Sequence, residues 1–505
     1  MKNQGRVTVF LCLIMSGMLL LGVTALRAAN LFAAKGKTAI AARSSVSSMK
    51  AMYQSYIFEH YHILLFDKTL GGRGEAAFEE RFSQNLSDNL SDAFTVTETA
   101  ITDFDMLTDG DNAALKTQIR DYMKYAAAEY GVDHLAGKVG DYEGRISEEA
   151  EDTIERSKEE GELPSDDGRT DTAGEGFPGD EVQGETGADP EEDGDVTDGS
   201  GETAEGSPKK GKVKDPRRVT KKMKGNLLLA IVLPEESEVA NEPIDMSILP
   251  SGEPDFSDFF SGETKGCDFD DIDEMKENLT DGEPWGSSLV DAGEGLAYAR
   301  CVFNSYTSQD RNEDTVLQYE LEYLAVGRPS DYMNLSAAVS RIVWMRVPLC
   351  FVYLQTDAVK MGEIRAITLP LSLIVMIPEP VLTQLVAGCW SYAEAVADVR
   401  TLVRGKKVGL TKNAANWVTD INNLGETVMS DVPESGVGLS YEDYLTILMS
   451  FHMDETYTRM LDLMQLNACR EDPEFRMTNA AVGFSVNVSV DYDGHTFSFE
   501  TDGEY

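Results

Sequence analysis

The amino-terminal apolar segment constrains this chain more than any other feature. From Val7 to Leu26 the sequence runs for twenty residues without a charged side chain. That is about the length an α-helix needs to cross the ~30 Å hydrocarbon layer of a bilayer. The sequence therefore predicts a single-pass protein of the cell membrane, whose remaining residues are attached to this helix.

A cleaved secretory signal is the alternative to a retained anchor. Lys2 and Arg6 precede the apolar run, as basic residues do in signal peptides. However, the run is longer than the ~7–15 residues of a signal core, and no suitable small-residue cleavage site follows it. We therefore expect the segment to be retained, with the lipid bilayer as its partner.

The residues after the apolar segment predict that the same helix continues. They are rich in alanine and free of proline, and apolar or aromatic residues recur at steps of three and four. These residues are Val46, Met49, Tyr53, Tyr56, His60 and Leu64. A helix of about 60 residues would reach roughly 90 Å. We expect residues 1–66 to form one transmembrane and stalk helix.

The flanking charges do not decide the orientation of the anchor. Two basic residues precede it, and four follow within about twenty residues, namely Arg27, Lys35, Lys37 and Arg43. Because long carboxy-terminal domains can still be translocated behind a signal anchor, we expect a cytoplasmic N-terminus and an extracytoplasmic body.

The formal net charge of −44 argues against nucleic acid as a partner, since phosphate contacts require a cationic surface. Residues 147–208 contain 23 Asp and Glu but only three Lys and Arg. Such a stretch cannot bury enough apolar surface to offset chain entropy. We expect residues 141–224 to be a disordered insertion, acidic first and then basic, and 251–284 to be a second acidic loop.

The basic end of this insertion has two interpretations. Residues 209–224 contain nine basic residues and one acid. They could bind an anionic polymer or lipid headgroups, or they could be a solvated segment that folds back on the acidic tract. We favour the second interpretation, because adjacent blocks of opposite charge attract each other.

The rest of the chain predicts an α+β body, with its first part at 67–140 and its main part at 225–505. Strands are expected at 94–107, at 316–327 and in a hairpin around Asp493-Gly494. Helices are expected at 75–94, 112–131, 289–306, 334–355 and 441–470, the last beginning at a Ser440–Asp443 cap. Residues 366–378 are too short for a second membrane span and predict a buried core helix.

No motif of high specificity for catalysis, cofactor binding or metal binding occurs in the sequence. The Gly-rich turn at 69–74 lacks the Gly-Lys-Ser/Thr of a phosphate loop, and the acidic segments lack calcium-loop spacing. His60 and His62 point to different faces of a helix. Five cysteines outside the apolar segment predict no complete disulfide framework, and Cys301, Cys350, Cys389 and Cys469 are expected to be buried thiols.

Several short sequence segments, taken in their order along the chain, resemble those of one group of proteins. They are Gly5 to Leu11; Tyr53 to Tyr56 and Glu59 to Asp67; Leu321 to Leu324, Gly327-Arg328 and Asn334-Leu335; Trp390 to Asp398 and Gly405-Lys406; and Tyr441 to Leu445 with Arg459 to Leu463. Together they resemble uncharacterised domain-of-unknown-function membrane proteins of Gram-positive bacteria, whose N-terminus is related to TadE/TadG-like pseudopilins of tight-adherence pilus systems.

The resemblance implies a cell-envelope or pilus-associated protein with no known activity to transfer. It also implies a processing site between Gly5 and Arg6. Pilin-like segments carry a glutamate five residues after the processing glycine, where this chain has Phe10.

Three functions are therefore open. The first is a structural or accessory component of a tight-adherence pilus or secretion system, with its membrane subunits as partners. The second is a cell-surface binding or adhesion protein that uses the helix as a stalk. The third is an envelope hydrolase with scattered catalytic residues. We expect the first, and no enzymatic activity.

Overall fold

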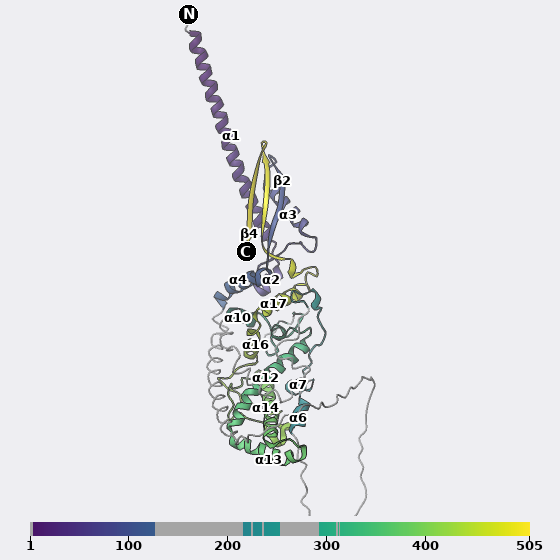
Figure 1. Ribbon diagram of the computed structural model, residues 1–505. Coiled ribbons are helices and arrows are strands. Elements are labelled where there is room, and N and C mark those ends of the chain that lie inside the picture. The colour runs from purple at the N-terminus through teal and green to yellow at the C-terminus, as the bar shows by residue number, and fades with distance from the viewer. Residues whose placement is uncertain are drawn as a thin grey trace, which may run out of the picture.

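The computed structural model describes residues 4–126, 216–223, 226–234, 237–252, 292–309, 312 and 314–505. A long N-terminal helix, α1 (Gln4–Lys50), leads into a body built from helices and one small sheet (Figure 1). The predicted mixture of helices and strands behind a long apolar helix is confirmed.

Helix α1 has two parts that differ in their surroundings. Its apolar residues from Val9 to Leu26 are exposed, many by more than half of their surface. From residue 34 onward, one face is buried at steps of three and four. The buried residues are Ala34, Thr38, Ala41, Ala42, Ser45, Val46 and Met49. The helix therefore projects freely at its start and packs against the body at its end.

The expectation of one helix through residue 66 is wrong. Helix α1 ends at Lys50, a turn follows at Ala51 and Met52, and α2 (Ser55–Tyr61) is a separate short helix. The chain doubles back between Gln54 and Leu65, whose backbone groups meet: the Gln54 N–H donates to the Leu65 carbonyl (2.8 Å). Helix α2 then ends at Tyr61, and the residue that caps it, His62, has a left-handed φ of 57°.

An antiparallel sheet in the described part of the chain brings residues 66–106 together with the C-terminal hairpin. Strand β3 (Ala480–Tyr492) pairs with β1 (Phe66–Asp67), β2 (Phe94–Met106) and β4 (His495–Glu504). The predicted hairpin turn at Asp493-Gly494 is confirmed, and both residues have positive φ, as a tight two-residue hairpin requires. The hairpin extends along α1 (Figure 1).

Helix α3 (Glu75–Asp88) and the end of α1 cover one face of this sheet. Aromatic rings fill the interface: Phe78 lies 5.3 Å from Phe66 and 5.2 Å from Phe484 between ring centroids. Alternate β3 residues, including Val486 and Val488, point into the same core. Helix α1 is therefore an integral layer of this small core.

A larger helical core forms the rest of the body. Its central element is α14 (Glu379–Val403), which contacts α6, α7, α12, α13 and α16. The helices of this region are α4 (Asp109–Ala126), α6 (Pro216–Met223), α7 (Asn226–Val232), α10 (Gly293–Val302), α11 (Glu320–Val326), α12 (Asp331–Thr356), α13 (Ala358–Val375), α15 (Leu424–Thr427), α16 (Tyr441–Ser450) and α17 (Met453–Ala468). Short 3-10 turns lie at Met246–Ile248, Ile421–Asn423 and Met477–Asn479.

Two element predictions in this region are wrong. The strand expected at 316–327 is largely helix α11, in which every residue is buried. Because burial on all sides removes the polar face, helical periodicity cannot be read there. The helix expected at 441–470 is divided into α16 and α17 by a break after Ser450, although its predicted Ser440–Asp443 capping box is confirmed.

The predicted insertions lie mostly outside the described residues. The acidic tract 147–208 and most of the acidic loop 251–284 belong to those parts. The prediction of disorder through residue 224 is wrong for 216–223, which form helix α6. The α6 residues Pro216, Thr220 and Met223 are buried, and the helix packs on α14. It does so because its apolar residues share one face.

The expected buried core helix at 366–378 is only partly confirmed. Residues 366–375 form the second half of α13, and Thr368 and Leu371 are buried. Leu373 and Ile374, however, are 83% and 68% exposed. Among the cysteines, Cys350 and Cys389 are buried as predicted, whereas Cys301 and Cys469 are half-buried.

Candidate functional site

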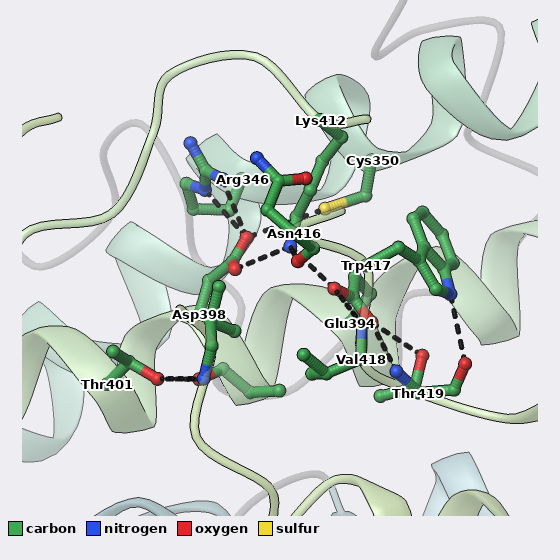
Figure 2. Close-up of polar contacts among 12 residues, drawn as sticks. Arg346, Cys350, Glu394, Asp398, Thr401, Lys412, Asn416, Trp417, Val418 and Thr419 are labelled. Carbon is green, nitrogen blue, oxygen red and sulfur yellow. Dashed lines mark hydrogen bonds and ion pairs between the residues drawn. The ribbon is translucent and has the colours of Figure 1, made fainter. Parts of the chain in front are cut away.

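The densest group of charged side chains among the described residues lies inside the helical core. Helix α14 contributes Glu394 and Asp398, which are four residues apart and share one face. Helix α12 contributes Arg346 and Cys350 with the same spacing. Lys412 enters from the segment after α14, so that three separate parts of the chain converge (Figure 2).

Asp398 lies between the two cations. Its Oδ2 accepts hydrogen bonds from Arg346 Nε (3.0 Å) and Nη2 (2.7 Å), and its Oδ1 accepts one from Lys412 Nζ (2.7 Å). Arg346 Nη1 donates to the Tyr444 hydroxyl (3.0 Å) and to the Leu410 carbonyl (3.1 Å). Arg346 thus links α12 to α14, to α16 and to the Lys412 segment.

Glu394 fixes the second half of the network. Its Oε1 accepts from Lys412 Nζ at 2.5 Å. Its Oε2 accepts the backbone N–H of Thr419 (2.9 Å) and the Thr419 hydroxyl (2.7 Å). Two indoles complete this side: Trp390 Nε1 donates to Thr419 Oγ1 (2.9 Å), and Trp417 Nε1 donates to the Thr419 carbonyl (3.0 Å).

The network is balanced in charge and closed to solvent. The side chains of Arg346, Asp398, Glu394 and Lys412 are all fully buried, with two positive and two negative charges. Burial on its own lowers the pKa of Lys412, but Asp398 and Glu394 outweigh it and hold that pKa above its ordinary value. The lysine is therefore a fixed cation rather than a proton carrier.

The one thiol of the network is inert. Burial, followed by the charge of Asp398, raises the pKa of Cys350 far above its ordinary value. The thiolate is the nucleophilic form of cysteine, so this residue is suited to packing only. With all four charges satisfied internally, the network can connect α12, α14, α16 and the 410–419 segment, and offers no free group to a substrate.

A second buried polar group lies on α11. Glu320 Oε2 accepts the N–H of Asn304 (3.1 Å), and Glu322 Oε1 accepts the N–H of Tyr306 (2.9 Å). Asn467 Nδ2 also donates to Glu320 Oε1 (3.0 Å). Burial raises the pKa of both glutamates to about 7. These carboxyls hold the segment after α10 against the core.

The sequence singled out only part of these groups. The segments on which the family resemblance rests include Trp390 to Asp398 and Tyr441 to Leu445. Sequence reasoning did not identify Arg346 or Lys412. A usable signal was present, because Glu394 and Asp398 are the only acids in a strongly apolar stretch of α14. Among the described residues, no group of three His, Cys, Asp or Glu is arranged to hold a metal ion.

The predicted processing site lies elsewhere in the molecule. Gly5 and Arg6 are in the first turn of α1, at the end farthest from the body (Figure 1). Phe10, the departure from the pilin pattern, is 65% exposed on the same helix.

Comparison with known protein families gives a match over the C-terminal part of the chain. The family described as "Family of unknown function (DUF5702)" matches residues 206–492, more than half of the chain. The matched region starts before α6 and ends at the last residue of β3, so it includes both buried polar groups. No curated protein and no solved structure matches the chain.

Proposed function

Because this chain belongs to the DUF5702 family of unknown function, we propose a role for it from its own architecture, namely a membrane-anchored structural or accessory protein of the cell envelope. Helix α1 holds the protein in the membrane by a single pass. The body carries no chemistry in its charged network and serves as a rigid head.

The exposure of α1 supports this proposal most directly. Helix α1 is long and apolar enough to span a membrane, and none of its apolar part is buried among the described residues. Large apolar surfaces of this kind are unfavourable in water and mark membrane or protein contact. The other long apolar helix, α12, is mostly buried and is a core helix.

The partners in this proposal are the lipid bilayer and membrane subunits of a tight-adherence pilus or secretion system. The pilus connection rests on the resemblance of the N-terminal segment, which also implies a processing site between Gly5 and Arg6. The net charge of −44 disfavours nucleic acid. We place the N-terminus in the cytoplasm and the body outside.

A stalked binding protein is the second candidate. The packing of α1 distinguishes it from the proposed accessory protein. That candidate treats the helix as a simple stalk and predicts that a fragment from residue 70 folds and binds alone. Here Val46, Met49 and Phe66 belong to the core of the sheet, so such a fragment lacks part of its own core.

Photo-crosslinking in native membranes tests the proposed role. A photoreactive residue replaces Leu19 or Leu20, which are 65% and 71% exposed on α1. The proposal expects crosslinks to membrane subunits of a pilus or secretion system. The same probe at Val437, which is 77% exposed on the body, is the control. A full-length chain that crosslinks only to lipid at both α1 positions would contradict the accessory role.

A further inference from the structure

The outer face of the second half of α13, from Leu369 onward, is apolar although nothing in the described structure covers it, whereas the first half exposes Glu363 and Arg365. Leu369, Leu373, Ile374 and Met376 are 63%, 83%, 68% and 91% exposed. The opposite face of the same helix is also apolar and packs into the body. A helical segment that is apolar all round, as the second half of α13 is, is normally covered on both sides. This surface, called here the α13 face, lies at the end of the body opposite the start of α1 (Figure 1).

The α13 face is held on a fixed frame. Asp357 caps the start of the helix by accepting the N–H groups of Val359 (3.0 Å) and Lys360 (3.2 Å). Thr368 and Thr383 share a buried hydrogen bond (2.9 Å) that joins α13 to α14. Met376 closes the helix in a left-handed conformation with φ of 58°. The apolar side chains are therefore displayed by ordered structure.

A cationic surface lies at the same end of the body. Helix α6 buries Pro216, Thr220 and Met223 and exposes Arg218, Lys221 and Lys222. Thr220 Oγ1 donates to the Cys389 carbonyl of α14 (3.4 Å). Helices α6 and α13 thus pack on the same helix, α14, and both lie toward the far end of the body (Figure 1).

We propose that this end of the body docks on an anionic lipid surface, with the α13 face entering the headgroup and acyl boundary and the α6 cations contacting phosphates. Amphipathic surfaces bind bilayers by this combination of apolar burial and attraction to anionic lipids. The inference goes beyond the proposed anchoring by α1 and rests on it, because the lipid surface at α13 is then the second one that the protein contacts.

Charge distinguishes this occupant from a second copy of the chain. The formal net charge of the protein is −44, which repels an anionic bilayer. The exposed α6 cations attract one, so they favour contact through this end of the body. Two copies that met through this end would bring two sets of Arg218, Lys221 and Lys222 together. A lipid surface satisfies the apolar and the cationic parts at once.

Vesicle capture tests the proposal on the full chain. The chain is reconstituted through α1 into phosphatidylcholine vesicles, and fluorescent acceptor vesicles with or without phosphatidylglycerol are added. We expect capture of the phosphatidylglycerol vesicles only. The double variant Leu373→Asp/Met376→Asp and the triple variant Arg218→Ser/Lys221→Ser/Lys222→Ser should each lower capture by about tenfold.

Val437→Asp is the matched control, since Val437 is 77% exposed and belongs to neither α6 nor α13, and this variant should capture the acceptor vesicles as the native chain does. Flotation of the phosphatidylcholine vesicles at alkaline pH measures separately whether the chain is anchored in them. A chain that does not float contradicts the proposed anchor, whereas a chain that floats without capturing acceptors overturns the docking inference. Disulfide formation between Met376→Cys copies without acceptor vesicles also overturns it, in favour of self-association.

Discussion

The buried charges stabilise the body only as a complete set. Lys412→Met removes one cation and leaves Glu394 and Asp398 facing a single Arg346 in a site closed to water. Removing one partner of a buried ion pair typically costs about 3–5 kcal/mol. We expect a loss of that size in the free energy of unfolding, measured by denaturant titration of the detergent-solubilised chain.

The double variant Lys412→Met/Glu394→Gln restores charge balance and serves as the control. It should recover part of the lost stability, because no charge is then left unpaired. A single Lys412→Met variant as stable as the native chain would show that the network does not hold α12, α14 and the 410–419 segment together.

The α11 carboxyls predict a specific dependence of stability on pH. Burial raises the pKa of Glu320 and Glu322 from 4.5 to about 7. A carboxyl with a raised pKa binds its proton more tightly in the folded state, so its contribution is present below pH 4.5 and is lost as the pH rises through 7. The loss is on the order of 3 kcal/mol for each group.

Melting temperatures between pH 5 and 8 measure this effect. The native chain should lose stability across this range, and Glu320→Gln/Glu322→Gln should lose clearly less. Identical slopes for the two proteins would mean that both carboxyls are already ionised in the folded state at pH 5.

Single residues of the site were largely beyond prediction from sequence. Glu394 and Asp398 stand out in an apolar helix, but Lys412 lies in an irregular segment with nothing to mark it as buried. Its partners come from α12 and α14, and such contacts depend on the tertiary fold rather than on local pattern. Glu320 and Glu322 appear as the polar half of an alternating strand until their burial is known.

Helix α1 and strand β4 pack so closely that one position on β4 must lack a side chain. A Cβ at Gly503 would collide with Val46 Cγ1 and lie 3.2 Å from Lys50 Cδ. Gly503→Val should therefore separate the end of α1 from the hairpin and speed hydrogen exchange at residues 38–49. Glu500→Val, an exposed position of the same strand, should leave exchange unchanged. Equal exchange in both variants would contradict the packing.

Elements were predicted best where one face is solvated. Strand β2 and the 480–505 hairpin show alternation because one side of the sheet is polar, and their predictions are confirmed. Helix α11 lacks a solvated face, so its periodicity was misread. The ends of α1 and α16 were missed because no proline or glycine stands at Lys50 or Ser450. Those breaks arise from tertiary packing.

We expect the body to require part of α1 in order to fold, because the end of α1 belongs to the core of the sheet. A fragment from residue 30 retains the buried side of α1, whereas a fragment from residue 70 loses it together with β1. We expect the longer fragment to unfold cooperatively and the shorter one to aggregate or melt at a much lower temperature. Thermal unfolding followed by circular dichroism compares them, and a stable 70–505 fragment would favour the simple stalk.

The central claim is that α1 is retained as the membrane anchor, and the N-terminal residue of the mature protein in isolated membranes tests it most directly. Mass spectrometry of the N-terminal peptide after alkaline washing gives that residue. The account predicts Met1, for an unprocessed anchor, or Arg6, for pilin-like processing after Gly5, and in both cases Val7 to Leu26 are kept. A mature protein that starts beyond Ala28 and appears in the soluble fraction would contradict the account.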